Sequence, residues 1–440
     1  MKLRYWFRLT KAFLMRFKSV LFAGVIAGLL IFSAARFFTP YIFPSSVSYI
    51  GQSGRFHIDE IPYEITSQIG EGLTTTDETG NVAPGLAKSW EYSDEGKVWT
   101  FTIDTDKMWH DGTYVSSYDI NYAFEDAQVS RPDEQTIVFT LNAPFSPFPV
   151  VVSRPVFKKG LLGTGEWEVL DIDVTNEFVE KITLVNAHNE KKVIKFYPTE
   201  EAVKDAYKLG QIDIISDLLD PFPFSEWDTV TTFENINDDR FVAVFFNNES
   251  DIFAGNKELR QALSYAINKE DFNAPRAIGP ISPSSWAYNS QIKDYKYDVD
   301  RAEELYDSLS DEMKENLSIN LTTSPVLLTT AEKVAGYWKE IGIDVQIHVS
   351  SILPEQYDAF LAIYNVPKDP DQYAIWHGSQ VQTNLSKLSS QRLNLLLEQG
   401  RLELDQQERK RIYLDFQRFL LEEAPAVFLY HPLSYTVARK

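Results

Sequence analysis

The sequence predicts a mixed α/β body that is exported from the cytoplasm and held by one N-terminal membrane helix. Three observations lead to this fold class. The 440 residues are 44% hydrophobic and 24% charged, which is a folded composition. Charge is distributed very unevenly along the chain, and one apolar run stands inside the basic part. Helical and strand patterns alternate in the second half of the body, which is typical of a partly parallel sheet.

The N-terminal segment and the body differ in charge. The first 44 residues hold seven Lys and Arg and no acid. Since the whole chain has 42 Lys and Arg against 63 Asp and Glu, the remaining 396 residues carry 35 cations and 63 acids, a formal charge of −28. So acidic a body argues against a nucleic-acid partner, which requires a basic surface for its phosphates.

The apolar run at residues 20–35 predicts the membrane helix. It is slightly shorter than the roughly 20 residues that a spanning helix needs, but Arg36 can extend to the interface and aromatic residues follow it. Six cations precede the run and keep the N-terminus cytoplasmic, which places the body outside the cytoplasmic membrane as a periplasmic or cell-surface domain. A signal peptide cleaved after Ala35 and a buried core helix are the alternatives.

Hydrophobic periodicity predicts the main elements of the body. Alternation of apolar and polar residues indicates strands at 98–103 and 136–141, and the first half of the body is the richer in strands. Apolar residues at helical spacing and helix-ending glycines define the second half. The helices are expected at 200–209, 257–268, 329–340, 391–402 and 407–421, and further strands at 212–215, 343–349 and 426–430.

The sequence contains no catalytic or metal-binding motif. The absence of cysteine excludes disulfides, thiolate metal sites and a lipid-modified cysteine. The six histidines are too far apart in sequence for a zinc pair, and neither a nucleophile elbow nor a phosphate-binding glycine loop is present. We therefore predict no catalytic residues, no metal ligands and no cofactor.

Several short motifs follow one another in a characteristic order. They include Glu71-Gly72-Leu73, residues 82–91 (VAPGLAKSWE), 99–103 (WTFTI), 109–113 (WHDGT), Tyr118-Asp119-Ile120, 163–167 (GTGEW), 208–213 (KLGQID), 259–267 (LRQALSYAI), 339–345 (KEIGIDV) and Asp369-Pro370-Asp371. In this order the chain resembles the extracytoplasmic solute-binding proteins of oligopeptide and dipeptide ABC importers, solute-binding protein family 5. The resemblance extends over most of the exported body.

The resemblance implies a two-lobe clamshell of the periplasmic-binding-protein type, in the peptide-binding cluster of type II. Lobe I is expected at residues 45–242, with a trimmed accessory subdomain at about 75–155, and is completed by 425–440. Lobe II is expected at 243–424. The basic segment and membrane anchor at 1–44 precede both lobes. The implied function is binding of a peptide or similar small solute between the lobes and its delivery to ABC permease subunits.

The chain departs from the family pattern where peptide binders hold the ligand's ammonium group. That position, three residues before the Asp369-Pro370 pair, is Val366, and Lys368 stands nearby. Three interpretations are open: Asp369 or Asp371 replaces the missing acid, both acids are structural turn residues, or the ligand is not a peptide. The stretch from Phe124 to Asp133 is also short for the family.

Motif proximity gives a set of candidate ligand-binding residues. They are Asn365, Val366, Asp369, Asp371 and Trp376, with Trp286 and Asn247 facing them and Trp167 as a further candidate. Two other functions remain open at this point. One is a related sensor or accessory surface protein without a transport role, and the other is an exported enzyme on an unrelated α/β scaffold.

Overall fold

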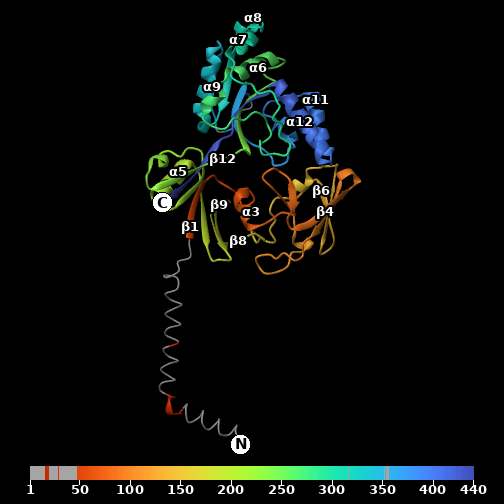
Figure 1. Ribbon diagram of the computed structural model, residues 1–440, viewed down its shortest axis with the longest axis vertical. Coiled ribbons are helices and arrows are strands. Elements are labelled where there is room, and N and C mark those ends of the chain that lie inside the picture. The colour runs from red at the N-terminus through yellow and green to blue at the C-terminus, as the bar shows by residue number, and fades with distance from the viewer. Residues whose placement is uncertain (1–14, 19–27, 29–46, 316, 351, 353–355) are drawn as a thin grey trace.

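The computed structural model describes residues 15–18, 28, 47–315, 317–350, 352 and 356–440. Two lobes with separate sheets stand one above the other, and a smaller sheet lies beside the lower lobe (Figure 1). The predicted membrane helix at 20–35 falls outside the described residues except for Gly28. Within the described part of the chain, no helix has the length and apolar character needed to cross a membrane.

Lobe I is built on a seven-stranded mixed sheet. Its strands, in spatial order, are β12 (Val230–Ile236), β18 (Leu433–Arg439), β11 (Ile214–Leu218), β1 (Val47–Ser53), β10 (Lys191–Tyr197), β9 (Phe178–Asn186) and β8 (Trp167–Thr175). The central strand β1 runs parallel to β10 and β11, and the other pairs are antiparallel. Helices α3 (Tyr63–Ile69) and α5 (Glu200–Lys208) pack on this sheet, with η3 (Phe224–Glu226) near β12.

The accessory subdomain is a four-stranded antiparallel sheet around an aromatic core. Its order is β4 (Ala87–Ser93), β5 (Val98–Ile103), β7 (Thr136–Leu141) and β6 (Ala127–Asp133), accompanied by the pair β2 (Thr74–Thr76) and β3 (Val82–Pro84), by α4 (Phe148–Val151) and by η1 (Asp94–Gly96). Trp99, Phe101 and Ile103 of β5 are buried, as their alternation predicted. At the Tyr118 motif, η2 (Ser117–Asp119) is a single turn, and the chain enters β6 soon afterwards.

Lobe II contains a five-stranded sheet that is covered on both faces. The strand order is β15 (Asp344–Val349), β14 (Ser318–Thr323), β16 (Ala359–Asn365), β13 (Arg240–Phe246) and β17 (Ala426–Tyr430). Alternate residues of β13 enter two different cores, because successive side chains point to opposite faces of a strand. Val242, Val244 and Phe246 belong to one core, whereas Phe241, Ala243 and Phe245 belong to the other.

Different helices contribute to the two cores of lobe II. The first core is formed with α6 (Lys257–Ala266), α7 (Val299–Asp307) and α9 (Leu328–Glu340), and the second with α10 (Tyr373–Trp376), α11 (Gln391–Leu402) and α12 (Gln406–Glu423). The remaining short elements are η4 (Lys269–Phe272), α8 (Asp311–Glu315) and η5 (Pro325–Leu327). The predicted helices and strands are all present, and those at 98–103, 136–141, 391–402 and 426–430 have the predicted ends.

Two short segments connect the lobes. The chain leaves the seven-stranded sheet after β12 and enters lobe II at β13, and it returns between β17 and β18. Residues 426–430, assigned to lobe I from the sequence, instead pair with β13 in the lobe II sheet. His431 lies at the return crossing, where its Nδ1 is 2.7 Å from the Arg240 carbonyl oxygen, and burial lowers the pKa of its imidazole.

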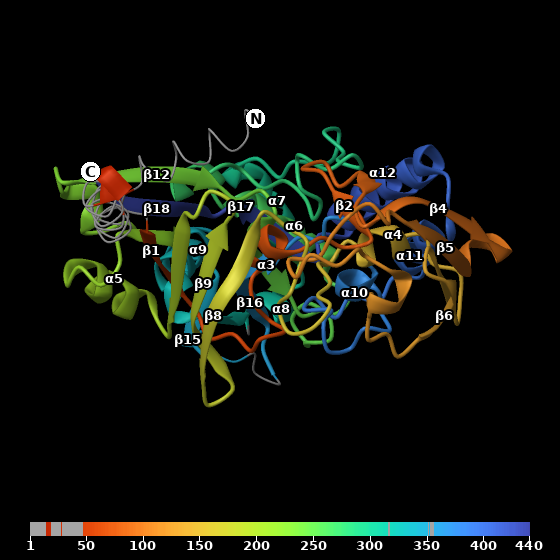
Figure 2. The ribbon, with the colours of Figure 1, turned by 90° about the horizontal axis from the view of Figure 1, so that it is seen from below.

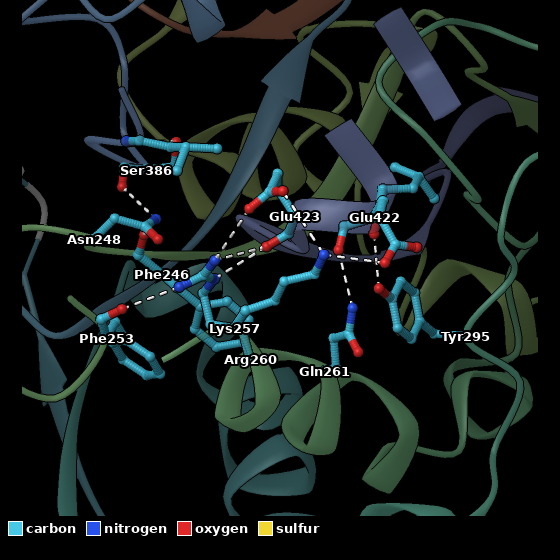
Figure 3. Close-up of polar contacts among 12 residues, drawn as sticks. Phe246, Asn248, Phe253, Lys257, Arg260, Gln261, Tyr295, Ser386, Glu422 and Glu423 are labelled. Atoms are coloured by element: carbon cyan, nitrogen blue, oxygen red, sulfur yellow. Dashed lines mark hydrogen bonds and ion pairs between the residues drawn. The ribbon is translucent and has the colours of Figure 1, made fainter. Parts of the chain in front are cut away.

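Arg260 of α6 joins the first helix of lobe II to the last (Figure 3). The final carbonyl groups of an α-helix have no partner within the helix. Arg260 donates from Nη2 to the carbonyl oxygen of Glu423 at 2.8 Å and from Nη1 to that of Phe253 at 3.0 Å. Gln261 donates to the carbonyl of Glu422 at 2.9 Å. These bonds position the end of α12 just before β17.

Replacing Arg260 should destabilise the fold. The Arg260 side chain is 3% exposed, and Arg260→Met leaves the Glu423 carbonyl without its donor. The Phe253 carbonyl loses one of two donors, because the Asn256 N–H still lies 3.2 Å from it. We therefore expect a loss of about 2 kcal/mol in the free energy of unfolding. Urea denaturation of the full chain measures it. Arg301→Met is the control, because the Arg301 side chain is 46% exposed. Its pair with Glu304 should contribute about 0.5 kcal/mol or less to the free energy of unfolding. Equal effects of the two changes would contradict the role given to Arg260.

Candidate functional site

The accessory subdomain, with β4 and β6, lies below α11 and α12 of lobe II (Figure 1), and the view from below has α10 and α11 over the same subdomain (Figure 2). Two cavities open along this junction, and residues of both partners line each of them. The larger is a groove of about 870 Å³ bordered by residues 123–127, 141–145, Phe148 and Val151 of the subdomain and by Tyr373, Glu398, Arg401 and Leu402 of lobe II. The smaller, of about 340 Å³, includes Trp90, Trp99, Trp286, Asp369 and Arg409.

Direct hydrogen bonds hold the two walls of the junction together. The Ser146 N–H donates to the Arg401 carbonyl at 2.8 Å, and the Trp286 N–H donates to the Thr79 carbonyl at 3.0 Å. Leu404, which follows α11, packs against the aromatic core of the accessory subdomain. The structure therefore has the lobes in contact at this end, with main-chain groups fixing their relative position.

The loop between β2 and β3 is shaped to fit against lobe II. Asp77 accepts hydrogen bonds from the main-chain N–H groups of Thr79 and Asn81, each at 2.9 Å, and this closes the loop. Gly80 has a positive φ of 83°, and a Cβ at this position would lie 2.3 Å from the Lys368 carbonyl oxygen. Glycine is thus required both by the backbone conformation and by the close approach of the Lys368 main chain.

Asp369 forms a buried ion pair with Arg409 of α12. The guanidinium donates to Asp369 Oδ2 at 2.7 Å and to Oδ1 at 2.5 Å, a two-bond arrangement in which both side chains are less than 9% exposed. Burial alone would lower the pKa of Arg409, but the charge of Asp369 raises it above its ordinary value. Asp369 is therefore committed to a structural partner.

Asp371 is also paired with an arginine. Arg401 Nε donates to Asp371 Oδ2 at 2.9 Å, and the Tyr373 N–H donates to Oδ1 at 3.0 Å. Burial raises the pKa of the Asp371 carboxyl, and the positive charge of Arg401 acts against this rise. Asp369 and Asp371 are the two acids that the sequence offered as replacements for the missing ammonium ligand, and both already neutralise cations.

Arg401, Tyr373 and His377 form a stacked column beside the larger groove. The Arg401 guanidinium carbon lies 3.9 Å from the centre of the Tyr373 ring, and the rings of Tyr373 and His377 are 4.0 Å apart. His377 Nε2 is 3.2 Å from Glu398 Oε1, and its Nδ1 is 2.7 Å from Ser379 Oγ. This column gives one wall of the groove a fixed aromatic surface.

The remaining predicted residues near the Asp-Pro-Asp motif have different surroundings. Trp286 lines the smaller cavity with Asp369 and Arg409. Val366 is 8% exposed and belongs to the second core of lobe II, where its N–H donates to the Asp239 carbonyl at 2.7 Å. Asn365 is exposed at the end of β16, and Lys368 pairs with the Asp239 carboxylate at 2.5 Å.

Three predicted residues lie away from the junction. Trp376 is 2% exposed and packs on Phe245 and Phe428, as in a core residue. Asn247 borders a separate cavity within lobe II, and its side chain donates to the Tyr357 carbonyl at 2.8 Å. Trp167 is 7% exposed in lobe I beneath the Lys192 ammonium, 3.8 Å from the ring centre. Trp376 shares the second core of lobe II with Val366, whereas Asn247 and Trp167 lie apart from the other candidates.

Sequence reasoning missed the two arginines, although one left a signal. Arg409, Tyr413, Phe416 and Leu420 are all buried and recur at helical spacing on the inner face of α12. A charged residue on the apolar face of a helix requires a buried partner. The identity of that partner, 40 residues away in the chain, was not visible in the pattern. Within the described ranges, no group of three or more acidic or histidine side chains could hold a metal ion.

Comparison with known proteins identifies the family. The model of bacterial extracellular solute-binding proteins, family 5, matches residues 81–384 of the chain. The chain belongs to this family. The match confirms the relationship inferred from the ordered motifs, and the two-lobe periplasmic-binding-protein architecture agrees with it.

Relatives at low identity cover most of the family 5 chain. The probable D,D-dipeptide-binding periplasmic protein DdpA of Escherichia coli is 23% identical, over 80% of this chain and 79% of its own. The oligopeptide-binding protein AppA of Bacillus subtilis is 21% identical, over 86% and 84%. The crystal structure of NikZ from Campylobacter jejuni in complex with Ni(L-His) superposes with a TM-score of 0.73 at 22% identity, covering 90% and 95%.

Removing the Asp369 carboxylate should destabilise the protein, because it leaves the buried guanidinium of Arg409 without a counter-charge. For Asp369→Ala we expect a loss of about 3–5 kcal/mol in the free energy of unfolding, measured by urea denaturation. The control is Asp415→Ala, which breaks an exposed pair with Arg418 on the same helix and should cost about 1 kcal/mol or less. A fully stable Asp369→Ala protein would contradict the structural assignment and leave the carboxylate available for a ligand.

Proposed function

We propose that this family 5 protein is the receptor of an ABC importer. It binds a peptide or another small solute between its lobes and delivers it to membrane permease subunits. The observation that carries the proposal is the family match together with cavities whose walls come from both partners at the lobe junction. Because each cavity needs both walls, a bound solute gains its full set of contacts only when the lobes are together.

The mode of solute binding differs from capture of a free peptide N-terminus by an acid near β16. Val366 occupies the expected acidic position and is buried, while Asp369 and Asp371 pair with Arg409 and Arg401. An ammonium group placed there would have to compete with an arginine that is already desolvated. We therefore propose that solute recognition relies on the cavities and not on these acids.

A co-purified or added solute should bind and stabilise the full-length protein. We expect native mass spectrometry of the protein in lipid nanodiscs to show a small molecule that is lost on denaturation. Adding that solute at 100 times its Kd should raise the free energy of unfolding by about 2.7 kcal/mol. Gly80→Val places a side chain against Lys368 at the edge of the smaller cavity, and it should weaken solute binding by obstructing lobe contact. Absence of any bound or stabilising solute in peptide, amino-acid and metal-chelate libraries would reject the receptor function.

We further propose that residues 20–35 anchor the receptor beside its permease. A tether raises the local concentration of the receptor without adding contacts. The intact mass of the membrane-extracted protein should include residues 1–35, and deletion of residues 1–44 should release the body from the membrane fraction. A mature chain that begins at Arg36 would instead identify the segment as a cleaved signal peptide.

A further inference from the structure

The larger groove at the lobe junction has a chemical character that neither the family match nor the motifs predict. Its subdomain wall includes Leu141, Phe145 and Phe148, and its lobe II wall includes Tyr373 and Leu402. Leu402 is 53% exposed and adds apolar area to this wall. A volume of about 870 Å³ lies within the range of cavities that enclose a small ligand.

The aromatic side chains of the groove are held rigidly. Phe124 packs on Phe148 with ring centres 5.7 Å apart, and Phe148 packs on Phe139 at 5.1 Å. On the opposite wall, the Tyr373 ring is fixed between Arg401 and His377. Rigid apolar walls favour a ligand with a hydrophobic group, since little side-chain freedom is lost when the group enters.

The charged residues of the groove are predominantly acidic. Glu125 and Asp126 line it from the subdomain and Glu398 lines it from α11, and all three are exposed. Arg401 is the cation among the lining residues, and its charge is already balanced by Asp371 at 2.9 Å. A solute with a positive charge would therefore meet three exposed carboxylates, of which Glu398 also contacts the His377 imidazole at 3.2 Å, whereas an anion would be repelled.

Both walls of the groove are positioned by the contact that joins the lobes. The Ser146 N–H donates to the carbonyl of Arg401. The Ser146 hydroxyl donates to the Gly400 carbonyl at 3.2 Å. Phe145 therefore stands beside the Arg401–Tyr373 column, with the guanidinium carbon 5.3 Å from its ring centre. A ligand in the groove would touch both lobes at the point where they close.

We propose that the solute carries a hydrophobic group, which fills this groove, and a positive charge, which lies at its rim beside Glu125, Asp126 and Glu398. The inference rests on the proposed receptor function and specifies the class of solute. Since an aromatic or aliphatic group and a cation suffice, the solute needs no free peptide N-terminus. This agrees with the pairing of Asp369 and Asp371 to arginines.

Three probes with the same hydrophobic part and different charges test the proposal. They are the N-acetylated dipeptide amides phenylalanyl-lysine, phenylalanyl-glutamine and phenylalanyl-glutamate, with charges of +1, 0 and −1. Their acetyl groups remove the α-ammonium, so an N-terminal acid cannot produce a preference among them. Binding to the full chain in nanodiscs is measured by isothermal titration calorimetry. We expect the lysine probe to bind about tenfold more tightly than the glutamine probe, and the glutamate probe to bind most weakly.

Matched variants locate the preference. The triple change Glu125→Gln, Asp126→Asn, Glu398→Gln should make the lysine and glutamine probes bind equally, whereas Leu402→Ser should weaken all three probes alike. Glu303→Gln, at an exposed position of α7, is the control that should leave the preference unchanged. In about 1 M salt, where the Debye length is about 3 Å, the preference should be much reduced in the unaltered protein. Circular dichroism melting checks that each variant is folded.

The outcomes separate this inference from the proposed function. Equal binding of the three probes, or a cation preference that survives in the triple variant, overturns the assignment of the groove. Failure of all three probes on a protein that binds a co-purified solute of another class also overturns it, while the receptor function stands. If no solute of any class binds, the receptor function fails and the inference fails with it.

Discussion

The ion pair between Asp369 and Arg409 is the interaction on which the lobe junction depends. It connects the turn after β16 to the first turns of α12, across 40 residues of sequence, at a place where both side chains are less than 9% exposed. A buried pair of this kind contributes little net stability compared with apolar packing, but removal of one partner is costly. The pair therefore keeps α10 and α12 in one arrangement. It also withdraws from ligand binding the acid that the sequence made most prominent.

The same constraint explains the order of the junction as a whole. With the turn after β16 held by Arg409, Asp371 reaches Arg401, and Arg401 in turn lies over Tyr373. The main-chain carbonyl of Arg401 then accepts the hydrogen bond from Ser146 of the accessory subdomain. A chain of short contacts thus runs from the centre of lobe II to the opposite wall. The groove between them therefore has fixed walls, and a ligand that binds there loses little side-chain entropy.

The acidic residues of the protein differ in what they can do at the lobe junction. The body carries a formal charge of −28, and most of its carboxylates form an ordinary solvated surface. At the junction, however, the acids fall into two groups. Asp369 and Asp371 are buried and neutralised by arginines, whereas Glu125, Asp126 and Glu398 border an apolar groove without an excess of cations. Only the second group is placed to select a solute by its charge.

The sequence by itself determined the family, the mixed α/β class and most of the elements. Ordered motifs and period-2 or helical spacing are local signals, so β5, β7, α11 and β17 have the ends that their residues indicated. The binding residues were less accessible to such reasoning. Of the candidates near the Asp-Pro-Asp motif, Trp286 lines a junction cavity, but Trp376 is a core residue and Asn247 borders another cavity. Which acid meets which arginine, and which aromatic ring faces the other lobe, was decided by tertiary contacts alone. Those contacts join residues far apart in the chain, and sequence spacing carries no information about them.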